Sequence, residues 1–157
     1  MTIAGKFTEW TFQKIANEVE NVIEEDSKVK HSMIQNKIER LIETDAISKF
    51  SRQYPGTSED FFEYPLPIMV QSGSNMTIHK FQSDSNSDLL NYRGVYINVC
   101  GKYCDMNAMA SRTLLVDPKQ EQKDAYMIAH DAQELLIARL KAGSTIASAY
   151  TAAKNHI

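Results

Sequence analysis

Apolar residues recur at helical spacing in two stretches near the start of the chain. The first stretch has them at Phe12, Ile15, Val19, Val22 and Ile23, and the second at Ile34, Ile38, Leu41 and Ile42. A repeat of three or four residues is typical of an amphipathic helix with one face toward a core. The pattern therefore predicts two N-terminal helices, the second beginning between Ser27 and His31.

The polar face of the first predicted helix is acidic, with Glu18, Glu20, Glu24 and Glu25. Such a face is usually a solvated helix surface, and the alternative is a docking face for basic segments. Both interpretations stay open on the sequence alone.

The middle of the chain predicts a loop and then strands. Periodicity is lost over residues 48–63, where Ser, Pro and Gly accumulate, so a loop is expected there. A short apolar run at residues 68–70 is expected to be extended, because prolines precede it. The β-branched and aromatic residues of "GVYINVCGKY" and "SRTLLVD" predict two strands joined by a turn near residues 105–107.

Helix signals return after the second of these strands. Asp117 is a candidate N-cap, Pro118 fits the first helical position, and Gln120 completes a pattern like a capping box. The predicted helix runs from 118 to about 141 and ends before Gly143, and Ser144 is expected to cap a further helix. Its apolar positions are Ala125, Ile128, Ala132 and Leu135. Helices, then strands, then helices indicate an α+β fold.

Composition narrows the classes of function. The 157 residues are 43% hydrophobic and 24% charged, which is typical of one globular domain. A net charge of -3 disfavours direct DNA binding, which usually needs a basic stripe, and suits a basic partner better. No apolar run approaches the roughly 20 residues needed to span a bilayer, so no membrane association is expected.

The candidate chemistry is sparse. Cys100 and Cys104 are expected to be reduced thiols of a cytosolic or nuclear protein, and no His or Cys pair completes a zinc finger with them. Nucleophile motifs such as G-x-S-x-G and Gly-rich phosphate loops are absent from the sequence. The four histidines are solitary, which is more typical of surface or packed residues.

A longer pattern resembles a known group of enzymes. "QSGSNMTIHKF" followed by "YINVCGKYCDMNAMASRTLLV" is similar to the core of the creatinase, prolidase and aminopeptidase P group, which has the pita-bread fold. Ser72, Gly73 and Asn75 match its Ser-Gly-x-Asn stretch, and His79 falls where a substrate-facing histidine is expected. Residues 111–113 resemble its Thr-Arg-Thr.

The same resemblance places two metal ligands on Asn98 and Met109, where the enzymes have aspartates. A neutral amide and a soft thioether are poor ligands for a pair of hard divalent ions. Asp105 is a nearby carboxylate, but it is expected in the hairpin turn. The resemblance therefore implies a non-catalytic domain without metal or other cofactor.

The match is closer to the large subunits of the FACT histone chaperone, in their N-terminal peptidase-like domain. "DSKVKHSMIQNKIERLIE", "YPLPIMVQSGSN" and "RTLLVDP" resemble that family in the same order. The resemblance implies a nuclear, chromatin-associated protein that reorganises nucleosomes in transcription and replication. It also implies histones as partners and contact with the small FACT subunit through other regions. The candidate histone-binding or peptide-binding residues are Gln71, Ser72, Asn75 and His79, together with Glu18, Glu20, Glu24 and Glu25.

A complete pita-bread domain needs a second half, so residues 1–157 are expected to be its first half, with the rest beyond residue 157. A half sheet with an open edge predicts self-association of the isolated chain. Two other functions remain open: a purely structural or partner-docking domain of the same complex, and, least favoured, a metal-dependent aminopeptidase with unusual ligands.

Overall fold

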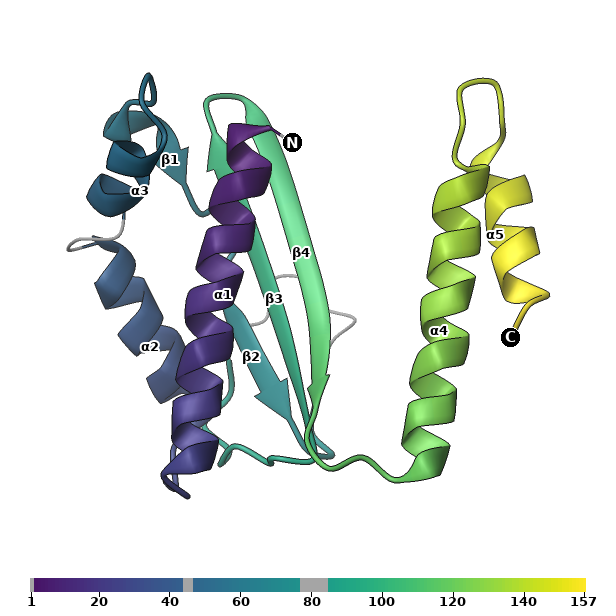
Figure 1. Cartoon of the computed structure of the whole chain (residues 1–157), viewed down its shortest axis with the longest axis horizontal. Coiled ribbons are helices and arrows are strands. Elements are labelled where there is room, and N and C mark those ends of the chain that lie inside the picture. The colour runs from purple at the N-terminus through teal and green to yellow at the C-terminus, as the bar shows by residue number, and fades with distance from the viewer. Residues whose placement is uncertain (1, 44–46, 77–84) are drawn as a thin grey trace. The chain divides into compact units, whose positions relative to one another are not determined.

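The chain forms two compact units, Met1–Val116 and Asp117–Ile157, in a computed structural model (Figure 1). The structure describes residues 2–43, 47–76 and 85–157. The first unit is a four-stranded antiparallel sheet with helices, and the second is a pair of helices. The predicted α+β class is confirmed.

Both predicted N-terminal helices are present. Helix α1 spans Ile3–Glu24 and helix α2 spans His31–Leu41, so α2 begins within the predicted window. The Thr2 hydroxyl caps α1 by accepting a hydrogen bond from the Gly5 N–H at 3.1 Å. The predicted apolar stripe of α1 is buried from Phe12 to Val22, because this face packs on the sheet.

The loop predicted over residues 48–63 is wrong. Helix α3 (Ile47–Gln53), the 3-10 turn η2 (Glu59–Phe61) and strand β1 (Phe62–Glu63) lie in or across this range. The reason is a long-range aromatic cluster. Phe50 is fully buried, with ring centroids 5.3 Å from Phe7 and 5.4 Å from Phe62. Tertiary packing therefore overrides a local sequence that is rich in turn residues.

The remaining strands are β2 (Met69–Ser72), β3 (Gly94–Tyr103) and β4 (Met106–Leu115). Strand β3 pairs along its whole length with β4, and its other edge pairs with β2 and with β1. The hairpin turn is Cys104 and Asp105, one residue earlier than predicted, because Cys104 adopts a left-handed φ of 53° that closes a tighter turn. Asp105 lies in this turn, as predicted.

One face of the sheet is covered by helices. Helix α1 runs along β3 and β4, and α2 lies against β2 (Figure 1). Val95, Ile97 and Val99 alternate along β3 and are fully buried in the main core cluster, as one face of a strand should be. Valine and isoleucine suit such a half-buried pleated surface.

A side chain of α1 enters the hydrogen-bond ladder between β3 and β4. The Thr8 hydroxyl accepts from the Gly101 N–H at 3.1 Å and donates to the Ala108 carbonyl at 3.1 Å. Gly101 and Ala108 are register partners, so the hydroxyl bridges a pair of the ladder. A Cβ at position 101 would lie 2.6 Å from Thr8 Oγ1, which explains why a glycine stands there.

The second unit is formed by α4 (Gln120–Arg139) and α5 (Ile146–Lys154), which run antiparallel (Figure 1). The start of α4 corrects the prediction. Asp117 has a left-handed φ of 47° and is not the N-cap. Lys119 is the N-cap, and its N–H donates to Gln122 Oε1 at 2.9 Å.

The connection between these helices also differs from the prediction. Helix α4 ends at Arg139, so Gly143, with φ +88°, lies in the connecting turn. The Ser144 hydroxyl accepts from the Lys141 N–H at 3.0 Å and closes this turn. The cap of α5 is therefore Thr145, whose hydroxyl accepts from the Ser148 N–H at 3.2 Å. Within the described ranges, no helix combines the length and the apolar character that crossing a membrane requires.

Candidate functional site

Asn98 and Met109 share one face of the β3–β4 hairpin, opposite the face that α1 covers. Asn98 is the register partner of Ser111, and Met109 is the partner of Cys100. Met109 is therefore two residues along β4 from the direct partner of Asn98. Such diagonal neighbours on paired strands are about 7–8 Å apart. The sheet thus brings together the two positions at which the sequence resemblance places metal ligands.

The two positions have different environments. Asn98 is 0% exposed, and its Oδ1 accepts a hydrogen bond from the Ser111 hydroxyl at 2.7 Å. Its Nδ2 is buried without a hydrogen-bond partner among the described residues. Met109 is 54% exposed. The hairpin therefore presents one buried amide and one exposed thioether.

Other ionisable groups near this face do not form a ligand cluster. In the three described ranges, no three His, Cys, Asp or Glu side chains gather closely enough to hold a metal ion. Cys100 is a free thiol, and burial raises its pKa, which favours its protonated form.

A buried hydrogen-bond network lies on the helix-covered side. His31 Nε2 lies 2.6 Å from the Ser72 hydroxyl, and His31 Nδ1 lies 2.5 Å from Asn86 Oδ1. The Ser72 oxygen also accepts from the Asn91 N–H at 2.6 Å. A Ser-His pair at this distance has the geometry of an activated nucleophile. However, both side chains are buried, so the pair joins α2, β2 and residues 86–91 rather than facing a substrate.

The structure separates the predicted cleft residues. Gln71 and Ser72 are both buried on β2, and as neighbours in a strand they face opposite sides of the sheet. Asn75 is exposed, and its side-chain amide donates to Asp88 Oδ2 at 3.1 Å. His79 lies outside the described residues. A binding role for these four residues stays a prediction.

The acidic residues of α1 are not equivalent. Glu18 is largely buried and forms an ion pair with Lys37 of α2 at 2.6 Å, so it ties the two helices together. Glu20, Glu24 and Glu25 are exposed. Of the four predicted acidic residues, these three are the ones exposed to solvent.

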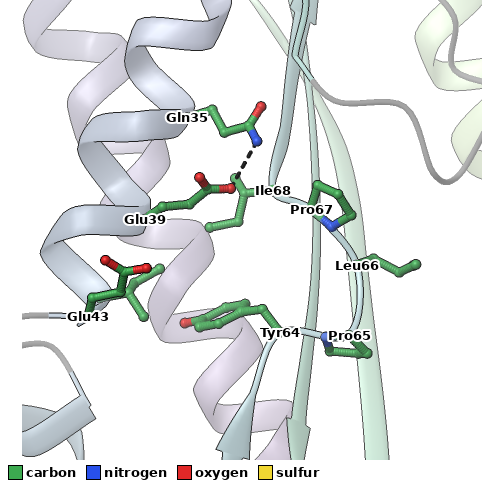
Figure 2. A pocket seen from close by; sticks show the side chains of 9 residues that line it. Gln35, Glu39, Glu43, Tyr64, Pro65, Leu66, Pro67 and Ile68 are labelled. Carbon is green, nitrogen blue, oxygen red and sulfur yellow. Dashed lines mark hydrogen bonds between the residues drawn. The ribbon is translucent and has the colours of Figure 1, made fainter.

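A groove between α2 and the segment before β2 was not predicted (Figure 2). Its volume is about 420 Å³. One wall is polar and comes from the end of α2 and the residues after it, and the other is mostly apolar. The lining residues are Gln35, Glu39, Ile42, Glu43, Tyr64, Pro65, Leu66, Pro67 and Ile68.

The groove is held by hydrogen bonds behind its walls. Buried Gln35 accepts from the Ser85 N–H at 2.8 Å and donates to Glu39 Oε1 at 2.9 Å. On the other wall, the Tyr64 hydroxyl lies 2.7 Å from Thr11 Oγ1. Burial raises the pKa of Tyr64, and this hydrogen bond opposes the rise to a smaller extent, so the ring stays neutral.

The sequence did carry a weak signal for this groove. Glu39 and Glu43 are four residues apart at the polar edge of the second predicted helix, and two prolines follow Tyr64. Neither segment by itself indicates a binding groove. The groove exists only because the fold brings residues 35–43 beside residues 64–68.

Residues 1–157 match, over their whole length, the family described as metallopeptidase family M24. The chain belongs to metallopeptidase family M24. Among solved structures, this M24 chain is similar to the X-Pro aminopeptidase of Thermotoga maritima, with a TM-score of 0.70 at 17% identity, over 98% of this chain and 38% of that one. That likeness confirms the predicted pita-bread fold.

Within the M24 family, the similarity extends to FACT complex subunits. The chain is 27% identical over 148 residues to FACT complex subunit ctc-2 of Neurospora crassa, covering 90% of this chain and 14% of that protein. It superposes on the N-terminal domain of FACT complex subunit SPT16 from Cicer arietinum with a TM-score of 0.85 at 26% identity, covering 98% of this chain and 36% of that one. The predicted resemblance to FACT large subunits is thereby confirmed. The chain spans about one seventh of the length of the curated relatives it matches.

Proposed function

We propose that this M24 domain is non-catalytic and binds basic polypeptide segments, histones above all, as part of a FACT-type chaperone. The observation that carries the first half of this proposal is the buried Asn98–Ser111 pair beside an exposed Met109. The names of the similar FACT subunits support the second half. Chromatin association, a nuclear location and a small FACT subunit bound through other regions belong to the same proposal.

The donor set at these positions does not fit a pair of divalent metal ions. Hard divalent ions prefer anionic oxygens, which also offset their charge. Asn98 offers one neutral oxygen that already accepts a hydrogen bond, and Met109 offers a soft sulfur. Neither position has a carboxylate that could support a metal-bridging water.

Noncovalent binding of cationic segments is consistent with the surface. Glu20, Glu24 and Glu25 are exposed on α1, and the chain carries a net charge of -3. Acidic surfaces attract basic segments and raise their rate of association, and the effect falls as salt screens the charges. The mild net charge indicates weak electrostatic attraction, so binding also needs a specific site on the domain.

The binding half is tested by titrating the chain against each purified, fluorescently labelled histone pair at low and near-physiological salt. We expect saturable binding to at least one pair that weakens, but persists, at the higher salt. Complete loss of binding at that salt would contradict the proposal. The domain would then be a structural or partner-docking element of the complex.

The non-catalytic half is tested separately. The chain is incubated with Mn²⁺ or Zn²⁺, desalted, and assayed for bound metal and for hydrolysis of an X-Pro dipeptide. We expect neither stoichiometric metal nor hydrolysis above background. Stoichiometric metal together with hydrolysis would establish a peptidase with unusual ligands.

A further inference from the structure

The polar wall of the groove carries negative charge at the C-terminal end of α2, where the helix dipole disfavours it. Glu39 lies in the last turn of α2, and Glu43 follows the C-cap Ile42. The C-terminal end of a helix dipole is negative, and like charges four residues apart on a helix repel each other. Both effects raise the energy of the unbound groove, and a bound cation would relieve both.

Among the described residues, neither carboxylate of the groove forms an ion pair. Glu43 forms no ion pair with any residue in the described ranges. The hydrogen bond that orients Glu39 comes from the neutral amide of Gln35. Glu18 of α1, by contrast, is paired with Lys37. The charge of the groove is therefore available to a ligand.

The carboxylate of Glu39 is also held in position. Because the Ser85 N–H donates to Gln35 Oε1, the Gln35 Nε2 must face Glu39. Figure 2 shows this amide directed at Glu39, which points across the groove toward Ile68. An oriented carboxylate loses less freedom when a cation binds.

The opposite wall suits an aliphatic stem. Pro65 and Pro67 restrict the backbone, and Tyr64 and Leu66 add apolar surface. A volume of about 420 Å³ is at the low end of ligand sites, which span about 300–1,000 Å³. It fits one or two long side chains rather than a folded element. Lysine and arginine combine such a stem with a cationic end.

We infer that the groove between α2 and residues 64–68 receives one lysine or arginine side chain from an extended basic segment of a partner protein. The cationic end lies between Glu39 and Glu43, and the stem lies along residues 64–67. This inference deepens the proposed function and rests on it, since it names the site and the group that is recognised.

The test uses fluorescence anisotropy with a short fluorescein-labelled lysine-rich peptide and its fully acetylated counterpart. The decisive variant is E39Q/E43Q. Glutamine at position 39 keeps an oxygen that can accept the Gln35 hydrogen bond, so the fold is retained, and circular dichroism verifies this. The control is E121Q/E134Q, which removes the same charge from two exposed positions of α4 that have no part in the proposed site.

We expect the wild-type chain to bind the lysine peptide and not the acetylated one. E39Q/E43Q should weaken binding roughly fivefold or more, whereas E121Q/E134Q should change it less than about twofold. Equal losses in both variants would overturn the inference in favour of a general charge effect. A larger loss in E121Q/E134Q would place the site on α4 and leave the proposed function standing. No binding by the wild-type chain, to this peptide or to histones, would remove the proposed function itself.

Discussion

Gly101 is a residue at which α1 and the β3–β4 hairpin are in tight contact. A methyl group there would overlap Thr8 Oγ1 at 2.6 Å and press on Phe7 Cδ1 at 3.1 Å. The Thr8 hydroxyl cannot retreat without breaking its two hydrogen bonds to the strands. A single side-chain hydroxyl therefore determines which residue is tolerated on β3.

We predict that G101A lowers the free energy of unfolding by about 2 kcal/mol or more, since overpacking a tight site typically costs 1–3 kcal/mol. Urea denaturation measures this. G94A is the control, because its Cβ would meet only Leu115 Cδ2 at an ordinary 3.6 Å. A G101A variant as stable as G94A would show that the helix and the hairpin can separate easily.

Asn98 is the residue at which the peptidase resemblance can be probed. An aspartate there would be fully buried, so its pKa in the folded state would be raised. Below its unfolded pKa of about 3.9 it is neutral in both states and has no ionisation penalty. Stability then falls as the pH rises toward the folded pKa, and stays low above it.

N98D should therefore lose at least about 2 kcal/mol of stability at pH 7 relative to the wild type, and much less at pH 4. Urea denaturation at both pH values measures the difference. N107D, an exposed change on the same hairpin, should show no such dependence. An N98D variant that is equally stable at both pH values would indicate that the site can solvate a carboxylate.

Helix α3 could not be predicted from the local sequence, whereas α1 and α2 could. The stripes of α1 and α2 were predictable because each repeats locally at helical spacing. Helix α3 was not, because it depends on Phe50 packing against Phe7, Tyr54 and Phe62, and Phe7 is far away in the sequence. Asp117 failed as a cap because its φ is left-handed, and Lys119 caps α4 instead.

We predict that F50A lowers the free energy of unfolding by about 3–5 kcal/mol, as expected for emptying a fully buried aromatic site. F61A removes a ring that is 51% exposed, and should cost less than about 1 kcal/mol. Thermal or urea denaturation compares the two. Similar losses would show that α3 contributes little to the packing of the first unit.

The candidate site likewise has one part that the sequence predicted and one part that it did not. The shared face of Asn98 and Met109 followed from the sequence resemblance, because strand pairing has a fixed period of two. The groove did not follow, because Glu39 and Tyr64 belong to segments with no local relation. Sites built within one hairpin can be read from spacing, whereas sites built between elements need the fold.

At the scale of the whole molecule, strand β4 forms one edge of the sheet that the structure describes. Within the described residues, β4 pairs only with β3, and its Met106 and Met109 are 58% and 54% exposed. An unpaired edge with exposed apolar side chains favours association through strand addition. Self-association of the isolated chain therefore remains a specific expectation.

We predict that the chain shows an average mass above that of a monomer at high concentration in light scattering after size-exclusion chromatography. M109K should shift it toward the monomer, because charge on an edge strand opposes strand addition. M33K, which adds the same charge at a 55% exposed position on α2, should not. Equal effects of both variants would point to net charge rather than the β4 edge.

The Thr8 bridge also affects the order in which the molecule assembles. The hydroxyl that bonds to the Gly101 N–H and the Ala108 C=O comes from a helix 93 and 100 residues earlier in the chain. Closing so long a loop is slow compared with forming a hairpin alone. The two hydrogen bonds from Thr8 should therefore form only when α1 docks on the hairpin. The Gly101 amide should then exchange with deuterated solvent at the rate at which the whole first unit opens.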